Sequence, residues 1–263
     1  MARKNIAQIL IEAQINEKIE YQRLFDMFYN CTFGCGPKVL ADVCKESFWS
    51  MPFRDTCISL DDFNDFHGFH FVKDPDRFCH DYLITFCEYT FNLLLGVDNI
   101  FQINTVRSMY FDQLYRVIEK LGYDFITSKN GLEILVPQNA NSVAVAEIVD
   151  TNLSYSILEY NHHSLKGDLT KKKTLLKFMA DDIEPQRKIL NGINKTLSDN
   201  LFRMLQKFVR HNNTDNTCIS SLTTEDIETC YDDIYQMWLL AKLEIDNLDR
   251  KKRVEEILRR IAD

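Results

Sequence analysis

Tyr123-Asp124-Phe125-Ile126-Thr127, then Ser128-Lys129-Asn130-Gly131 and Leu132-Glu133-Ile134-Leu135-Val136-Pro137, is the stretch that decides the fold. Here a helical hydrophobic period gives way to an extended one, and an Asn-Gly pair between two such runs is a strong hairpin signal. A lone two-stranded hairpin is too small to be stable in water. We therefore predict a mainly α fold, a helical bundle with a small β-hairpin at about residues 123–136 packed on it.

The sequence on both sides of this hairpin favours helices. Only 8 Gly and 5 Pro occur in 263 residues, and 45% of the residues are hydrophobic, a composition with few sharp turns and ample material for a core. We expect amphipathic helices over 5–29, from an Asp74-Pro75-Asp76 start, and over 104–121. The aromatic-rich segment 47–74 has no clean period and is expected to be irregular.

From Asn139 onward the pattern is helical, with breaks expected near Gly167, Pro185, Gly192 and 212–223. The chain is thus expected to divide into a region 1–138 and a helical region 139–263. Ser198-Asp199 is the predicted cap of the helix that runs into Arg210, and Thr223-Thr224-Glu225-Asp226 the predicted start of the last helix. Beyond Asp249 the sequence is strongly charged but keeps an apolar edge of Val254, Ile257, Leu258 and Ile261.

The composition also limits the location and the chemistry of the protein. The N-terminus lacks a secretory pattern and no apolar run approaches the ~20 residues of a membrane span, so we expect a cytoplasmic protein with reduced thiols. A zinc site built from Cys31, Cys35, Cys44, Cys57 and the His67/His70 pair has irregular spacing, and structural thiols are the expected reading. No metal and no cofactor is predicted, and Gly-rich phosphate loops and nucleophile elbows are absent.

Arg210-His211-Asn212-Asn213 concentrates the most chemistry in the sequence, at the end of a predicted helix. One interpretation is structural, because cations and Asn are common at helix C-termini. The other is that Arg210 binds a phosphate while His211 acts as general acid or base. A single Arg-His pair does not decide between them.

A second candidate stretch is Asn161-His162-His163-Ser164-Leu165-Lys166-Gly167-Asp168. It is either a polar loop ended by Gly167, with Asp168 capping the next helix, or a group in which His162, His163 and Lys166 face Arg210. Residues 161–188 carry a local net charge of +3 in a chain of net charge −8. A positive groove suits a phosphate backbone, and the acidity elsewhere favours a short RNA over a long duplex.

The order of these motifs over about 155–250 resembles the HEPN-type domains of bacterial abortive-infection (Abi-like) proteins. The order is the two-His loop, Lys171-Lys172-Lys173, Glu184-Pro185, Arg210-His211-Asn212-Asn213, and a final helix bearing Tyr and Trp. The resemblance implies a toxin-type ribonuclease of phage defence, with an active site assembled across a homodimer from an Arg, a polar residue and a later His. Arg210 matches the Arg and His211 the polar position, but no His follows in 212–263.

The resemblance implies a metal-independent RNA endonuclease with Arg210 and His211 as catalytic residues. Asn212, Asn213, His162, His163 and Lys166 would then bind the substrate, an RNA such as tRNA. The expected assembly is a homodimer, with an operon-encoded protein partner also expected. The missing His leaves an alternative open: a non-catalytic helical interaction or regulatory module, antitoxin-like or scaffold, that binds a protein partner.

Overall fold

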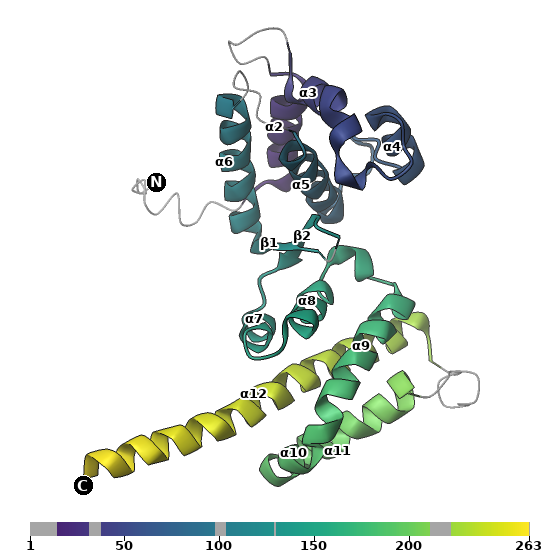
Figure 1. Ribbon diagram of the computed structural model, residues 1–263. Coiled ribbons are helices and arrows are strands. Elements are labelled where there is room, and N and C mark those ends of the chain that lie inside the picture. The colour runs from purple at the N-terminus through teal and green to yellow at the C-terminus, as the bar shows by residue number, and fades with distance from the viewer. Residues whose placement is uncertain (1–14, 32–37, 98–103, 129, 211–221, 263) are drawn as a thin grey trace, which may run out of the picture. The chain divides into compact units, whose positions relative to one another are not determined.

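The structure is a computed structural model, and it describes residues 15–31, 38–97, 104–128, 130–210 and 222–262 (Figure 1). It confirms a mainly helical fold with a small β-hairpin. The chain divides into two compact units, Met1–Leu135 and Val136–Asp263, close to the expected boundary at residue 138. We call them unit 1 and unit 2 and describe each by itself.

Unit 1 consists of helices followed by the hairpin. Its elements are α2 (Glu17–Tyr29), α3 (Leu40–Ser47), the 3₁₀ turns η1 (Phe48–Ser50) and η2 (Pro52–Arg54), α4 (Leu60–His67), α5 (His80–Leu95), α6 (Asn104–Leu121), and the strands β1 (Tyr123–Thr127) and β2 (Glu133–Pro137). The α6 bounds and the hairpin confirm the predictions. Residues 5–14 of the predicted first helix lie outside the described residues. Segment 47–74 is more regular than predicted, because Ser59 caps α4 and Gly68, at φ +73°, ends it.

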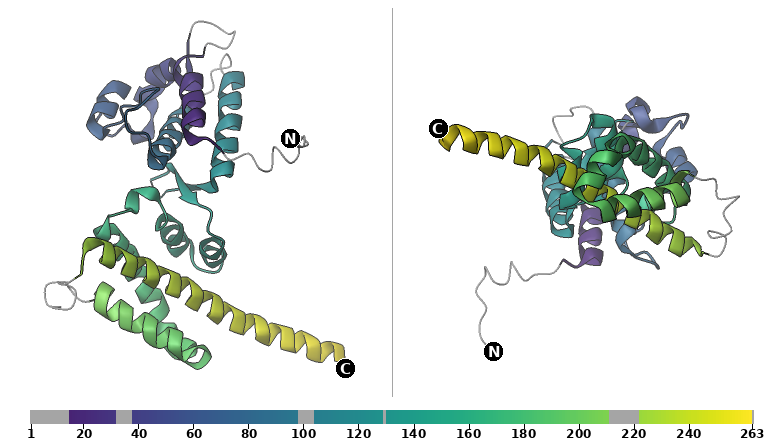
Figure 2. Two further views of the ribbon diagram at one scale, coloured as in Figure 1. Left: turned by 180° about the vertical axis from the view of Figure 1, so that it is seen from behind. Right: turned by 90° about the horizontal axis from the view of Figure 1, so that it is seen from below.

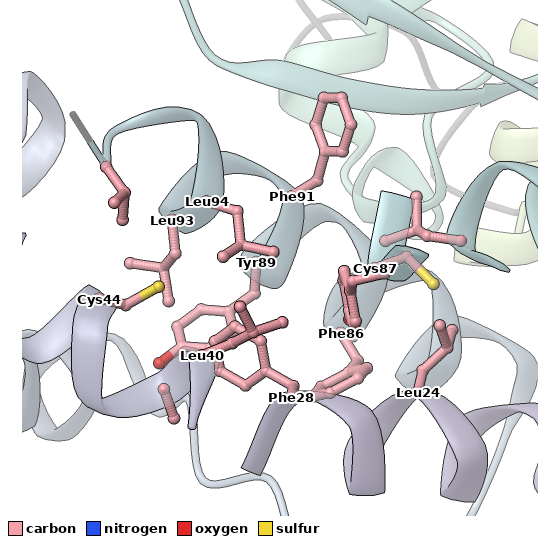
Figure 3. Close-up of a cluster of buried hydrophobic side chains, with 14 of the residues drawn as sticks. Leu24, Phe28, Leu40, Cys44, Phe86, Cys87, Tyr89, Phe91, Leu93 and Leu94 are labelled. Atoms are coloured by element: carbon pink, nitrogen blue, oxygen red, sulfur yellow. The ribbon is translucent and has the colours of Figure 1, made fainter. Parts of the chain in front are cut away.

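The core of unit 1 lies between α5 and its helical neighbours. Figure 3 shows Phe86, Cys87 and Leu94 of α5 among Leu24 and Phe28 of α2 and Leu40 and Cys44 of α3. These side chains are at most 1% exposed. Burial raises the pKa of the Cys44 thiol to about 12, so this Cys is a protonated apolar group, in keeping with the structural role expected for it.

The predicted start of α5 at Asp74-Pro75-Asp76 is wrong, because the helix begins at His80. The carboxylate of Asp74 forms an ion pair with Lys18 on α2 at 2.6 Å instead of capping a helix. Lys73 likewise pairs with Asp26 of α2, and the Tyr21 hydroxyl donates to the Val72 carbonyl. Contacts with α2 therefore engage this segment ahead of α5.

Unit 2 is helical after the end of β2. Its elements are α7 (Ala140–Ala146), α8 (Thr151–Glu159), η3 (His163–Leu165), α9 (Leu169–Ile183), η4 (Glu184–Gln186), α10 (Arg187–Ile193), α11 (Lys195–Met204), the π-helical turn η5 (Leu205–Arg210) and α12 (Thr224–Ala262). A second core joins α9, α11, η5 and the first part of α12, with Leu176, Met179, Leu201 and Trp238 fully buried.

The helix ends of unit 2 follow the predictions in part. Thr223 and Asp226 cap α12 reciprocally, because each backbone N–H donates to the side chain of the other residue, which confirms the predicted start. Ser198-Asp199 does not cap α11: Asn194 does, accepting from the Leu197 N–H at 3.0 Å. Gly192 lies inside α10, so the break falls at Asn194 rather than at the glycine.

Candidate functional site

Arg210 lies at the end of η5, against the C-terminal end of α9. Its Nη1 is 2.8 Å from Oε2 of Glu184, and its Nη2 is 4.0 Å from Asp181 and donates to the Ala180 carbonyl at 3.4 Å. The side chain of Arg210 is 34% exposed. Two carboxylates thus offset the charge of this guanidinium, and one bond goes to a carbonyl near the negative end of a helix. These contacts are consistent with a structural role for Arg210 at least as much as with a phosphate-binding one.

His211, Asn212 and Asn213 lie outside the described residues. The structure therefore gives no geometry for the expected general acid or base, nor for the two amides. Arg210 is the last residue of this motif that it describes.

His162, His163 and Lys166 lie in the loop between α8 and α9. His162 is the N-cap of η3: its Nδ1 accepts from the Ser164 N–H at 3.2 Å. The rings of His162 and His163 lie 4.4 Å apart between centroids, and Lys166 is exposed. Gly167, at φ +80°, ends the loop as expected, and Asp168 caps α9.

Within one chain, the structure does not bring this loop to Arg210. The loop adjoins Asp168 before the first turn of α9, whereas Arg210 contacts Ala180, Asp181 and Glu184 at the other end. The rise of an α-helix places these two ends about 18 Å apart. A site that joins His162 or His163 to Arg210 would need a second copy of the chain.

A buried polar network that the sequence reasoning missed lies beside the loop. Lys172 is 6% exposed, and its Nζ is 2.8 Å from both Glu228 and Asp232 on α12. Glu228 also accepts from the Gly167 N–H at 2.8 Å, and these two bonds lower the pKa of its carboxyl. The Tyr160 hydroxyl donates to Asp232 at 3.0 Å. Lys172 therefore holds α9 on α12 and is not available to a phosphate.

The same network continues into the core of unit 2. Tyr160 stacks on Tyr235 with ring centroids 4.2 Å apart. The Tyr235 hydroxyl donates to the Ile157 carbonyl at 2.8 Å and meets the Asn161 amide at 2.9 Å and the Ser142 hydroxyl at 2.8 Å. Burial raises the pKa of Tyr235 to about 12. Asn161 belongs to the candidate loop, but its side chain therefore hydrogen-bonds to buried residues of the core.

The predicted basic stretch is partly neutralised in the structure. Lys171 pairs with Asp168 at 3.5 Å, Lys172 is paired as above, and Arg187 pairs with Glu184 at 3.6 Å. The positive charge counted over 161–188 is therefore not a continuous free groove. The sequence does contain a signal for Lys172, which lies three residues after Leu169 and four before Leu176, on the apolar face of α9.

A different surface of unit 2 is the end of α12. In Figures 1 and 2 the C-terminal part of this helix extends past α7–α11. Val254, Ile257, Leu258 and Ile261 lie there on one face and are 53%, 55%, 60% and 74% exposed. We call these four residues the α12 ridge. Their spacing of i, i+3, i+4 and i+7 matches the anchor pattern of a helix that binds in a groove.

Comparison with protein-family models, with curated proteins and with solved structures found no match. The resemblance to HEPN-type domains therefore stays a prediction. Among the described residues, no helix combines the length and the apolar composition needed to cross a membrane.

Proposed function

We propose that this protein is a helical interaction module that presents the α12 ridge to a partner protein. The observation that carries the proposal is the exposure of all four ridge side chains on a helix that continues beyond the core of unit 2. Contiguous apolar surface of this kind marks interaction sites in folded proteins. Single exposed apolar residues are common and would carry no such weight.

The part of α12 that carries the ridge is not stabilised by burial. Residues 250–261 are exposed throughout, so core packing, the main source of helix stability, does not act on them. Ion pairs within the helix take over part of that role: Arg250 pairs with Asp246, Lys252 with Asp249, and Arg260 with Glu256. A preformed helix loses less conformational entropy when it binds, which suits a docking element.

Charge indicates the chemistry of the partner. Segment 249–262 contains six cations and three anions, in a chain whose net charge is −8. The fitting partner surface is an apolar groove with an acidic rim.

A second copy of the chain fits the ridge less well. In a ridge-to-ridge coiled coil the core positions before the ridge would be Asn247 and Arg250, an amide and a cation where an apolar seam needs apolar side chains. The partner is therefore expected to be a different protein, such as the product of a neighbouring gene.

Site-directed photo-crosslinking in the native cell tests the proposal. A crosslinking amino acid at Val254 is expected to capture one discrete partner, and the same residue at Arg259, on the far face of the helix, is not. The double variant Ile257→Asp/Leu258→Asp should abolish the adduct and leave far-UV circular dichroism unchanged. Equal capture from both positions, or an adduct that survives the double variant, would refute the proposal, and a product of twice the chain mass would assign the ridge to self-association.

Ribonuclease activity is the second candidate, and the partial exposure of Arg210 directly before His211 favours it. In this reading the guanidinium exchanges Glu184 for a phosphate and the reaction runs through the 2′-hydroxyl of RNA. The test incubates the purified protein with total tRNA and with labelled single-stranded RNA in EDTA. Cleavage lost in both Arg210→Ala and His211→Ala would establish the nuclease. No cleavage by the parent, alone or with the captured partner, would leave the interaction module as the function.

A further inference from the structure

Unit 1 contains a pocket that neither candidate function uses. Its volume is about 160 Å³, and we call it the α5–β2 pocket. Four aromatic and three aliphatic residues make up most of its lining: Phe53, Phe63, Phe69, Tyr89, Leu93, Leu132 and Ile134. Polar residues complete the lining: Thr85, Glu88, Asn92 and Glu133. We infer that this pocket binds a neutral compound through one aromatic ring.

The polar groups of the lining are engaged in holding the pocket together. The Asn92 amide donates to the Glu133 carbonyl at 2.7 Å and accepts from the Glu133 N–H at 2.8 Å. The Leu135 N–H donates to Glu88 at 2.6 Å. These bonds fix β2 along α5, so the pocket is a consequence of how the hairpin is anchored.

The remaining polar side chains also have partners outside the pocket. The Thr85 hydroxyl donates to the Asp81 carbonyl at 2.7 Å, and the Tyr89 hydroxyl donates to Asn64 at 2.9 Å. No Lys or Arg lines the pocket, so an anion has no counter-charge there. An anionic ligand would lose its hydration without equivalent compensation and would also face the Glu88 and Glu133 carboxylates, and the mainly apolar walls favour a neutral apolar group as the occupant.

Size and wall chemistry indicate an aromatic ring. A cavity of about 150 Å³ with apolar walls accommodates benzene, so this pocket has room for one six-membered ring. The ring of Phe69 lies 5.9 Å from that of Phe63 and 5.2 Å from that of Tyr89, both in tilted orientations. A bound ring can make edge-to-face contacts with such walls. Fused rings would have to extend through the opening.

Binding of small probes to the whole chain tests this inference. By ligand-detected NMR, toluene and indole are expected to bind saturably, whereas benzoate is expected to bind at least tenfold more weakly. Ile134→Phe, which fills the pocket from the partly exposed strand β2, should lower the affinity for toluene at least tenfold. The matched control Ile126→Phe, on β1 and outside the lining, should bind as the parent does.

Three results would overturn the inference: no saturable binding of either neutral probe, benzoate that binds as tightly as toluene, or unchanged affinity in Ile134→Phe. Thermal unfolding monitors the folding of each variant. If Ile134→Phe does not fold, Leu132→Phe replaces it, with the same expected loss. Both neutral probes should also raise the unfolding temperature of the parent and leave that of the filled variant unchanged, because only a folded pocket binds them.

Discussion

At the scale of single residues, Glu228 is a group whose ionisation stabilises unit 2. Its carboxylate accepts from the Gly167 N–H and from Lys172, and both bonds lower its pKa in the folded state. A depressed carboxyl pKa contributes stability above the unfolded value of about 4.3. This stability is lost as the pH falls through the folded pKa. The network should therefore weaken in acid.

Glu228→Gln is predicted to lower the free energy of unfolding at pH 7 by about 1–3 kcal/mol, the usual cost of losing a hydrogen bond to a charged group. Below the folded pKa the parent also carries an uncharged group, so the difference should shrink. Urea unfolding at pH 7 and at about pH 3 measures it. Glu255→Gln, on the exposed part of α12, is the control and should change neither value. A difference that is equal at both pH values would contradict this account.

Residue types alone predict which side chains can do chemistry, but not their partners. Arg210 is recognisable as a cation at a helix end, yet its contacts with Asp181 and Glu184 depend on how η5 packs against α9. The spacing of Lys172 from Leu169 and Leu176 indicates that it lies on the apolar face of α9, but its partners Glu228 and Asp232 on α12 are not evident from the sequence. In both cases the partners are set by the packing of elements that are far apart in the sequence, and a local pattern of charges does not predict that packing.

At the scale of elements, Asn92 links the hairpin to α5 and supports the wall of the α5–β2 pocket. Asn92→Ala removes the partners of both the N–H and the C=O of Glu133. We predict a loss of about 2 kcal/mol in the stability of unit 1, since two part-buried groups lose their partners and each costs about 1 kcal/mol, the low end of the range for buried groups. Asn92→Asp keeps the acceptor for the N–H and should cost less. Amide exchange at Glu133 should accelerate in Asn92→Ala, and unchanged exchange would argue against this anchor.

Helix starts were predictable where the capping residues had no competing partner. Thr223 and Asp226 are free to cap each other, and α12 starts where the sequence predicts. Asp74 has a similar signature but pairs with Lys18, so α5 starts later. Asn194 caps α11 in place of Ser198, whose side chain is buried. Local propensity therefore predicts the existence of helices better than their ends.

At the scale of the whole molecule, the described residues form two separate hydrophobic cores. One spans Tyr21 to Leu135 and the other Val145 to Ala241, so no buried apolar residue of one core belongs to the other. Each unit also exceeds the size at which a core alone sustains a fold. We therefore predict that the two units unfold independently.

Core truncations of matched kind test this independence. Phe86→Ala opens a cavity in the first core and Leu176→Ala one in the second, where both side chains are fully buried. The expected costs are about 3–5 and 2–5 kcal/mol. Calorimetry of the parent should resolve two transitions, with each variant shifting only one of them, and the fragment 136–263 should retain the transition that Leu176→Ala lowers. A single transition that both variants lower would show that the cores share their stability, because independent folding requires each cavity to act only on its own unit.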